Sequence, residues 1–159
     1  MRAVPTTEGL QHQRKLSLPT TEAWWLDCLE RGYVFRSKLG LEAEFATWHA
    51  TISMELLFAS YTEFAKTRNE RRILSREMLG KFFAGLNAPP QRWRNGTVGE
   101  HVLEENNNYG GIVRRSKLVK RTTTGYVVGE LDKARADCLR VTGLDIAWDD
   151  DADEAGDDE

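Results

Sequence analysis

The stretch that decides the fold reads LFASYTEFAK (57–66), then SREMLGKFFAGL (75–86), then RRSKLVKRTTTGYVVG (114–129). In the first two segments apolar residues recur every three or four positions, which is typical of amphipathic helices. In the third, two runs at about 112–121 and 125–129 are predicted to be strands joined by the Thr-Thr-Thr-Gly turn. The order therefore predicts a helix, a shorter helix and a basic β-hairpin.

The residues before this stretch predict more helix. Thr21 is expected to cap a helix that contains WWLDCLER (24–31) and ends at Gly32. Its apolar face is expected to be core. The apolar residues from Phe45 to Lys66 fit one long amphipathic helix, and Ser75 is expected to cap the next one.

The region between the second helix and the basic hairpin predicts a loop. The Pro-Pro pair at 89–90 forbids further helix, and the Gly- and Asn-rich sequence that follows is expected to hold one helical turn near 98–104. Tyr-Gly-Gly at 109–111 indicates a turn. Gly125 is expected to take a positive φ in the hairpin turn.

The whole chain predicts an α+β, mainly helical fold of one domain. Residues 1–20 are interpreted as an N-terminal arm, 21–148 as the folded domain, and 149–159 as a disordered acidic tail. The domain is expected to close with a helix over 131–142 and with Trp148 folded back onto the core. The element order predicts a winged helix-turn-helix whose wing is the basic hairpin, with flanking helices.

The net charge of −3 hides a strong asymmetry along the chain. The tail 149–159 carries eight acidic residues and no base, whereas 68–121 contains twelve Lys or Arg against five Glu. The folded part is therefore basic, which favours a nucleic-acid partner. Two hypotheses stay open for the tail: competition with DNA for the basic residues, or solubilisation alone.

The candidate DNA-binding residues are the cations of this basic region and one tryptophan between two of them. Outward cations on alternate strand positions suit phosphates, and cations on the outer face of the second helix suit a groove. Trp93 has two interpretations: stacking on an unpaired base, or a core plug beneath a loop, which is the commoner role. The full set is Arg71, Arg72, Arg76, Lys81, Arg92, Trp93, Arg94, Arg114, Arg115, Lys117, Lys120 and Arg121.

Catalytic and cofactor signals are weak. His12, His49 and His101 are far apart in sequence, and no phosphate-binding or nucleophile-elbow motif is present. We therefore expect no enzyme activity, no cofactor and no metal. Cys28 and Cys138 are expected to be reduced and partly buried, and the absence of a long apolar run predicts a cytoplasmic protein without membrane contact.

The order of these motifs resembles the C-terminal region of phage and plasmid primase–helicases, which have a superfamily III helicase core of the poxvirus type. The end of their helicase region is similar to RAVP (2–5), Thr7, Leu10, Gln13, Ser17, Leu18 and AWWLDCLERG (23–32). The helix pattern with the basic hairpin is similar to their winged-helix domain. The residues that carry the resemblance after position 32 are Tyr61, Phe64, Ala65, Ser75, Leu79, Gly80, Phe83, Leu131, Ala134, Arg135, Thr142, Gly143, Ile146 and Trp148.

The resemblance spans nearly the whole chain up to residue 148 and implies a DNA-binding accessory domain of a replicative helicase–primase. Walker and primase motifs are absent from this sequence, so neither activity is carried over. Three functions are left open: binding of duplex or forked DNA, docking onto a helicase or primase subunit, and regulation as a small phage transcription factor. The Trp24–Trp25 face has two interpretations, docking onto a missing helicase domain or the core of this domain, and the core is favoured. The oligomeric state is not predicted.

Overall fold

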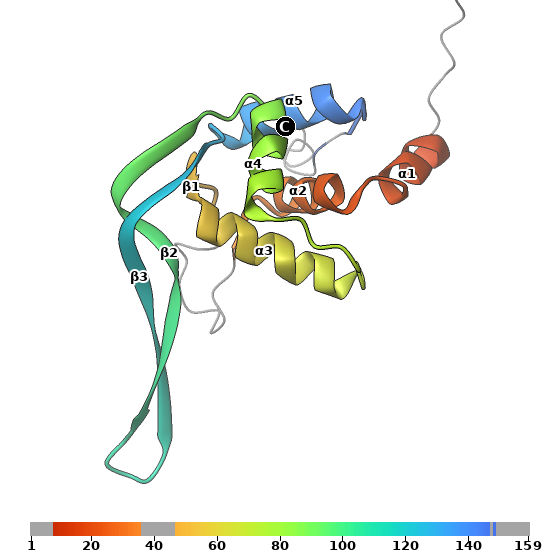
Figure 1. Cartoon of the computed structure of the whole chain (residues 1–159). Coiled ribbons are helices and arrows are strands. Elements are labelled where there is room, and N and C mark those ends of the chain that lie inside the picture. The colour runs from red at the N-terminus through yellow and green to blue at the C-terminus, as the bar shows by residue number, and fades with distance from the viewer. Residues whose placement is uncertain (1–7, 36–46, 147, 149–159) are drawn as a thin grey trace, which may run out of the picture.

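A computed structural model describes residues 8–35, 47–146 and 148, which form five helices and a three-stranded antiparallel sheet (Figure 1). The strand order in the sheet is β1-β3-β2. This confirms the predicted α+β class. The elements are α1 (Glu8–Leu16), α2 (Thr20–Arg31), β1 (Thr51–Ser53), α3 (Met54–Thr67), α4 (Arg76–Gly85), β2 (Pro90–Asn106), β3 (Ile112–Val127) and α5 (Leu131–Thr142).

The prediction of one helix from Phe45 to Lys66 is wrong, because a strand precedes a shorter helix. Thr51–Ser53 pairs with the end of β3, so these residues are extended. The Ser53 hydroxyl accepts the Leu56 N–H at 3.3 Å and caps α3. The β-branched residues of β1 and this cap separate strand from helix, although the apolar spacing continues across both.

The hairpin is longer than predicted and turns at a different place. β2 covers the residues expected to form a loop and a helical turn at 98–104, and β3 runs unbroken through the expected Thr-Thr-Thr-Gly turn. The hairpin turn lies at 107–111, which confirms the turn predicted at Tyr-Gly-Gly (109–111), and Gly110 takes a φ of +77° there. Gly125 does not take a positive φ. Instead, Gly125 lies within β3 opposite Ser53, where its Cα is close to the backbone of β1.

The segment interpreted as an N-terminal arm contains α1 and the first residue of α2. Pro19, not Thr21, is the N-cap of α2, and Thr21 is buried. The other helix ends confirm their sequence signals. Gly32 and Gly143 stop α2 and α5 in the left-handed conformation, and the Ser75 hydroxyl accepts the Met78 N–H at the start of α4.

The core lies between α2, α3, α4 and the root of the sheet. Trp24 and Trp25 are almost completely buried in it, which confirms that this face of α2 is core. The Trp24 indole N–H donates to the Ser60 hydroxyl at 3.0 Å, and that hydroxyl donates to the Val34 carbonyl at 2.7 Å. Phe83 of α4 packs edge-to-face on Trp25 at 5.0 Å.

A buried arginine joins the C-terminal segment to the core. Arg135 donates to the Leu29 carbonyl through Nε and Nη2 at 3.2 and 3.0 Å. Its guanidinium lies 4.7 Å from the centroid of the Trp148 ring, which packs against the core as predicted. The predicted disordered tail and the start of the predicted arm lie outside the described residues.

Candidate nucleic-acid interface

Helix α4 has one buried and one exposed face. Leu79 and Phe83 are fully buried, whereas Arg76 and Lys81 are exposed. The Arg76 guanidinium lies 5.2 Å from the centroid of the Phe58 ring on α3, a cation–π contact that ties this cation to the neighbouring helix. Lys81 forms no ion pair within the described part of the chain. The outer face of α4 therefore carries one unpaired cation, Lys81, and one cation, Arg76, whose guanidinium packs on Phe58 of α3.

The connector between α3 and α4 has a defined conformation and displays two further arginines. The Glu70 carboxylate accepts the Thr20 hydroxyl at 2.6 Å and the Arg72 N–H at 3.4 Å, and these bonds hold its pKa below the usual value. The Tyr61 hydroxyl accepts the Leu74 N–H at 3.2 Å. The side chains of Arg71 and Arg72 are exposed at this fixed connector.

The root of the hairpin is fastened to α3 by one carboxylate. Glu55 accepts the Thr123 hydroxyl at 2.6 Å and Nη2 of Arg121 at 3.1 Å. Partial burial alone would raise the pKa of Glu55, but these hydrogen bonds outweigh it and hold the pKa below the usual value. Arg121 therefore anchors the hairpin as well as exposing its charge.

Near the tip of the hairpin, the arginines predicted to bind DNA face glutamates. Nε of Arg114 lies 3.1 Å from a Glu104 carboxylate oxygen, and the two residues are direct neighbours in the ladder. Nε of Arg115 lies 4.0 Å from an oxygen of Glu105. Sequence reasoning missed both pairs because it placed the glutamates in a loop. The distal half of the hairpin is consequently close to neutral.

The proximal half of the hairpin keeps its positive charge. Lys117 and Lys120 lie opposite His101 and Thr97 in the ladder, and no carboxylate of the described residues pairs with either lysine. Arg92 and Arg94 on β2 are also exposed and form no ion pair there. These four cations come from both strands of the hairpin.

Trp93 stands between Arg92 and Arg94 and is half-buried, so it is neither a core plug nor fully exposed. Its indole lies over two glycines: a Cβ at Gly96 would be 2.4 Å from Nε1, and one at Gly125 would be 2.7 Å from Cη2. The ring also lines a cavity of about 190 Å³ between β1 and the hairpin.

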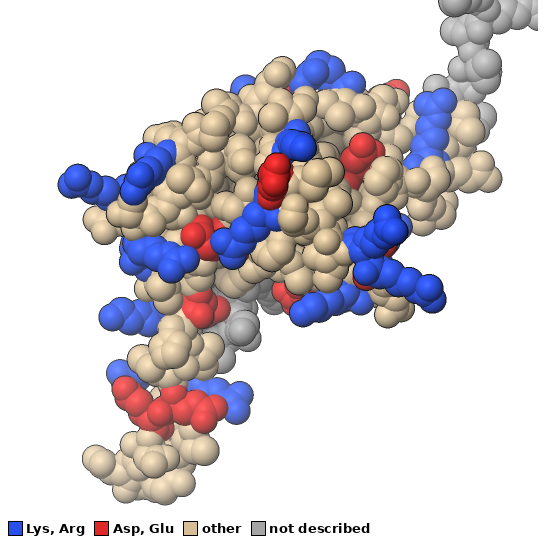
Figure 2. Space-filling model, in the orientation of Figure 1, with Lys and Arg blue, Asp and Glu red and all other residues tan. Residues whose placement is uncertain are grey.

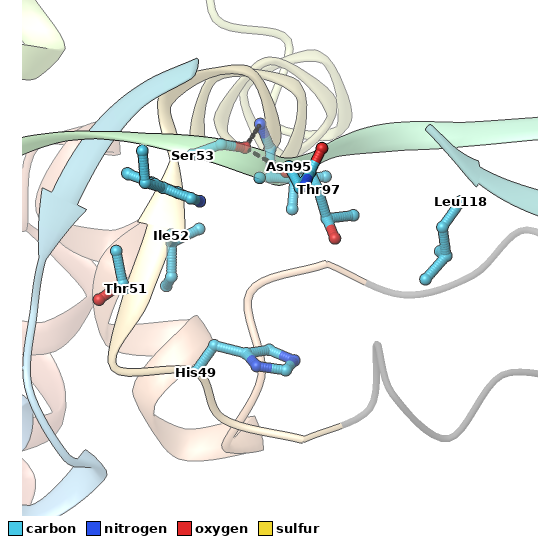
Figure 3. Close-up of a pocket in the computed structure, with 10 residues that line it drawn as sticks. His49, Thr51, Ile52, Ser53, Asn95, Thr97 and Leu118 are labelled. Atoms are coloured by element: carbon cyan, nitrogen blue, oxygen red, sulfur yellow. Dashed lines mark hydrogen bonds between the residues drawn. The ribbon is translucent and has the colours of Figure 1, made fainter. Parts of the chain in front are cut away.

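Figure 3 shows how that cavity is built. The His49 ring points into it from the segment before β1, Ile52 lines it from β1, and Thr97 and Asn95 border it from β2. The Ser53 hydroxyl donates to the Thr97 carbonyl at 2.7 Å and closes one side. His49, expected on a helix, lies outside any helix.

The basic surface is the set of exposed cations on the connector, α4 and the hairpin that have neither a carboxylate partner nor a cation–π contact among the described residues. Figure 2 shows Lys and Arg side chains over the connector, along α4 and along the hairpin, with Asp and Glu side chains among them on α4 and the hairpin and gathered near the tip. The members of the basic surface are Arg71, Arg72, Lys81, Arg92, Arg94, Lys117 and Lys120.

The two cysteines lie in the core and, in the sequence, away from the basic surface. Cys28 and Cys138 are buried free thiols, and burial raises the pKa of each to about 12. Within residues 8–35, 47–146 and 148, no three His, Cys, Asp or Glu side chains are grouped as metal ligands. The same residues include no helix with the length and apolarity needed to cross a bilayer.

Comparisons with known proteins give no relative for this chain. No protein-family model, no curated protein and no solved structure matches it.

Proposed function

We propose that this chain is a non-catalytic DNA-binding domain of the winged-helix type, which binds mainly through phosphate contacts. The observation that carries the proposal is the basic surface: seven exposed cations from the connector, α4 and the hairpin that have neither a carboxylate nor an aromatic partner among the described residues. Cations in this number that contact phosphates would release several counterions from DNA, and this release would drive binding and make it weaken with salt.

The order of the elements supports the winged-helix part of the proposal. Strand β1 lies between α2 and α3, helix α4 precedes the hairpin, and the sheet order is β1-β3-β2. In this arrangement α4 would be the recognition helix and the hairpin the wing. With Lys81 as its unpaired cation and Arg76 held against Phe58, α4 would read few base edges. We therefore expect modest sequence specificity.

The individual cations are expected to contribute unequally. Arg114 and Arg115 face Glu104 and Glu105, so their attraction for phosphate is partly cancelled. Arg121 is engaged by Glu55. The unpaired members of the basic surface should supply most of the affinity. The resemblance to primase–helicases further suggests a role in replication beside a helicase or primase subunit.

Reversing two hairpin charges tests the proposal. The double variant Lys117→Glu with Lys120→Glu should weaken binding to duplex DNA roughly tenfold or more at low salt. It should also reduce the slope of log affinity against log salt by about two, because two phosphate contacts are lost. Binding is measured by fluorescence anisotropy with a labelled duplex. The control variant, Arg14→Glu with Arg140→Glu, changes the net charge by the same amount as the hairpin variant, but its substitutions lie on α1 and α5. It should leave the affinity for DNA nearly unchanged.

Equal losses in the two double variants would contradict binding through the basic surface, because only net charge would then matter. An unchanged affinity in the hairpin variant would likewise reject it and favour the alternative, a domain that docks onto a helicase or another protein. A steep preference for one duplex sequence would favour a transcriptional regulator instead.

A further inference from the structure

We infer that Tyr109, at the tip of the β2–β3 hairpin, is a base-stacking site that recognises the exposed nucleobases of a fork or duplex end. The inference rests on the proposed function and deepens it by naming the form of DNA and the residue that detects it. Neither the basic surface nor Trp93 is required to contact the unpaired base.

Tyr109 is unusually exposed for an aromatic residue. Its side chain is 95% exposed, the highest value among the large apolar residues that the structure describes. The hairpin that carries it projects away from the helical body (Figure 1). The ring therefore stabilises no core, and both of its faces are free to stack on a flat aromatic ligand.

The turn that holds Tyr109 is fixed by hydrogen bonds. The Asn107 side-chain oxygen accepts the N–H groups of Tyr109 and Gly111 at 3.0 and 2.7 Å, and the Asn107 N–H donates to the Gly111 carbonyl at 2.8 Å. Gly110 supplies the left-handed φ of +77°. A Cβ at Gly111 would lie 2.9 Å from the Asn107 amide. A turn ordered in this way lowers the entropy cost of presenting the ring.

The charge around the tip suits a base rather than a phosphate. Residues 106–113 contain no charged side chain, and the two arginines nearest to them are paired with Glu104 and Glu105. Next to the turn, Ile112 is also 66% exposed. An aromatic ring beside an apolar residue on an uncharged tip matches the side chains that wedge against base steps.

The length of the hairpin sets the position of the junction. From Gly96 at the root to Asn106 at the tip, the strand spans ten steps, or roughly 33 Å at the usual rise of a β-strand. That distance equals about ten base pairs at 3.4 Å each. If the basic surface holds the duplex at the root, the tip reaches a junction about ten base pairs away.

The experiment compares two DNA substrates with equal duplex length. One is a fork with 2-aminopurine next to the junction, and the other is a duplex closed at both ends by non-nucleotide linkers, so that it contains no unpaired base. We expect the full chain to bind the fork about tenfold more tightly and to quench the 2-aminopurine fluorescence. Tyr109→Ala should bind both substrates equally and leave the fluorescence unchanged, whereas Tyr109→Phe should behave like the original chain.

The outcomes separate this inference from the function on which it rests. If Tyr109→Ala keeps the fork preference, or the original chain shows none while still binding the closed duplex, the stacking site is rejected and the basic surface is not. If the original chain binds neither substrate, the proposed function fails. Leu103→Ser, at an apolar residue of β2 that is 39% exposed, serves as the control for lost apolar area and should keep most of the preference; a loss equal to that of Tyr109→Ala would overturn the assignment to the ring. A change in oligomeric state caused by Tyr109→Ala would assign the tip to a protein contact and also overturn it.

Discussion

Phe83→Ala is expected to lower the free energy of unfolding by about 3–5 kcal/mol, the range for removing a fully buried phenyl ring. Phe83 is completely buried and joins three parts of the core. Its ring packs edge-to-face on Trp24 and Trp25, with centroids 6.2 and 5.0 Å away, and stacks on Tyr126 of β3 at 5.1 Å. The cavity left by alanine would lie between α2, α4 and the sheet. Urea denaturation followed by tryptophan fluorescence measures the change.

Phe82→Ala is the matched control, because Phe82 precedes Phe83 on the same helix but is only partly buried. It should cost clearly less than Phe83→Ala. Equal costs for the two substitutions, or a cost below about 1 kcal/mol for Phe83→Ala, would contradict the placement of α4 against the sheet.

Gly125→Ala is expected to lower the free energy of unfolding by about 3 kcal/mol, the upper part of the range for overpacking. A Cβ at this position would lie 2.0 Å from the Ile52 carbonyl oxygen and 2.7 Å from the Trp93 ring. Gly125 pairs with Ser53 in the ladder, so the strands would have to separate to relieve the clash. Because the Ile52 contact is with backbone, no side-chain rotation can remove it. The same denaturation assay reports the loss.

Gly99→Ala provides the comparison in the same hairpin. Gly99 lies on β2, and a Cβ there meets no atom within 4 Å. Alanine should therefore be tolerated at Gly99 with little change in stability. If both alanines were tolerated equally, the close approach of β1 to β3 would be refuted.

The helices were predictable from the sequence where the local signals were strong. The Ser75 side chain caps the start of α4, and Gly143 ends α5 in the left-handed conformation, as these residue types predict. The burial of Leu79 and Phe83 on α4 and of the Trp24–Trp25 face also followed from spacing, although Met78, which has the same spacing on α4, is exposed. These features depend on neighbours within one or two turns, which a single sequence records.

The sheet was harder to predict because its pairing depends on distant residues. Thr51–Ser53 continues the apolar spacing of α3, so the periodicity alone does not separate strand from helix, and the pairing partner in β3 is distant in the sequence. The Thr-rich segment was mistaken for a turn, but β-branched threonines favour strands. The Asn107–Gly111 segment carries the stronger turn chemistry, since Asn and Gly accept the conformations that the turn needs.

The candidate site shows the same division. That the cations cluster between 68 and 121 is a property of composition and could be predicted. Which of them are neutralised depends on the strand register, which brings Arg114 opposite Glu104. The contact of Arg76 with Phe58 and the engagement of Arg121 by Glu55 likewise join separate elements. No local pattern could identify these pairs.

The salt dependence of DNA binding tests the central claim most directly. The full chain is titrated into a labelled duplex, closed at both ends, at a series of salt concentrations, and binding is followed by fluorescence anisotropy. Contact between the basic surface and about four to six phosphates predicts micromolar binding at low salt and a slope of log affinity against log salt of about −4 to −5. No binding at the lowest salt, or binding with a slope near zero, would contradict recognition through this surface.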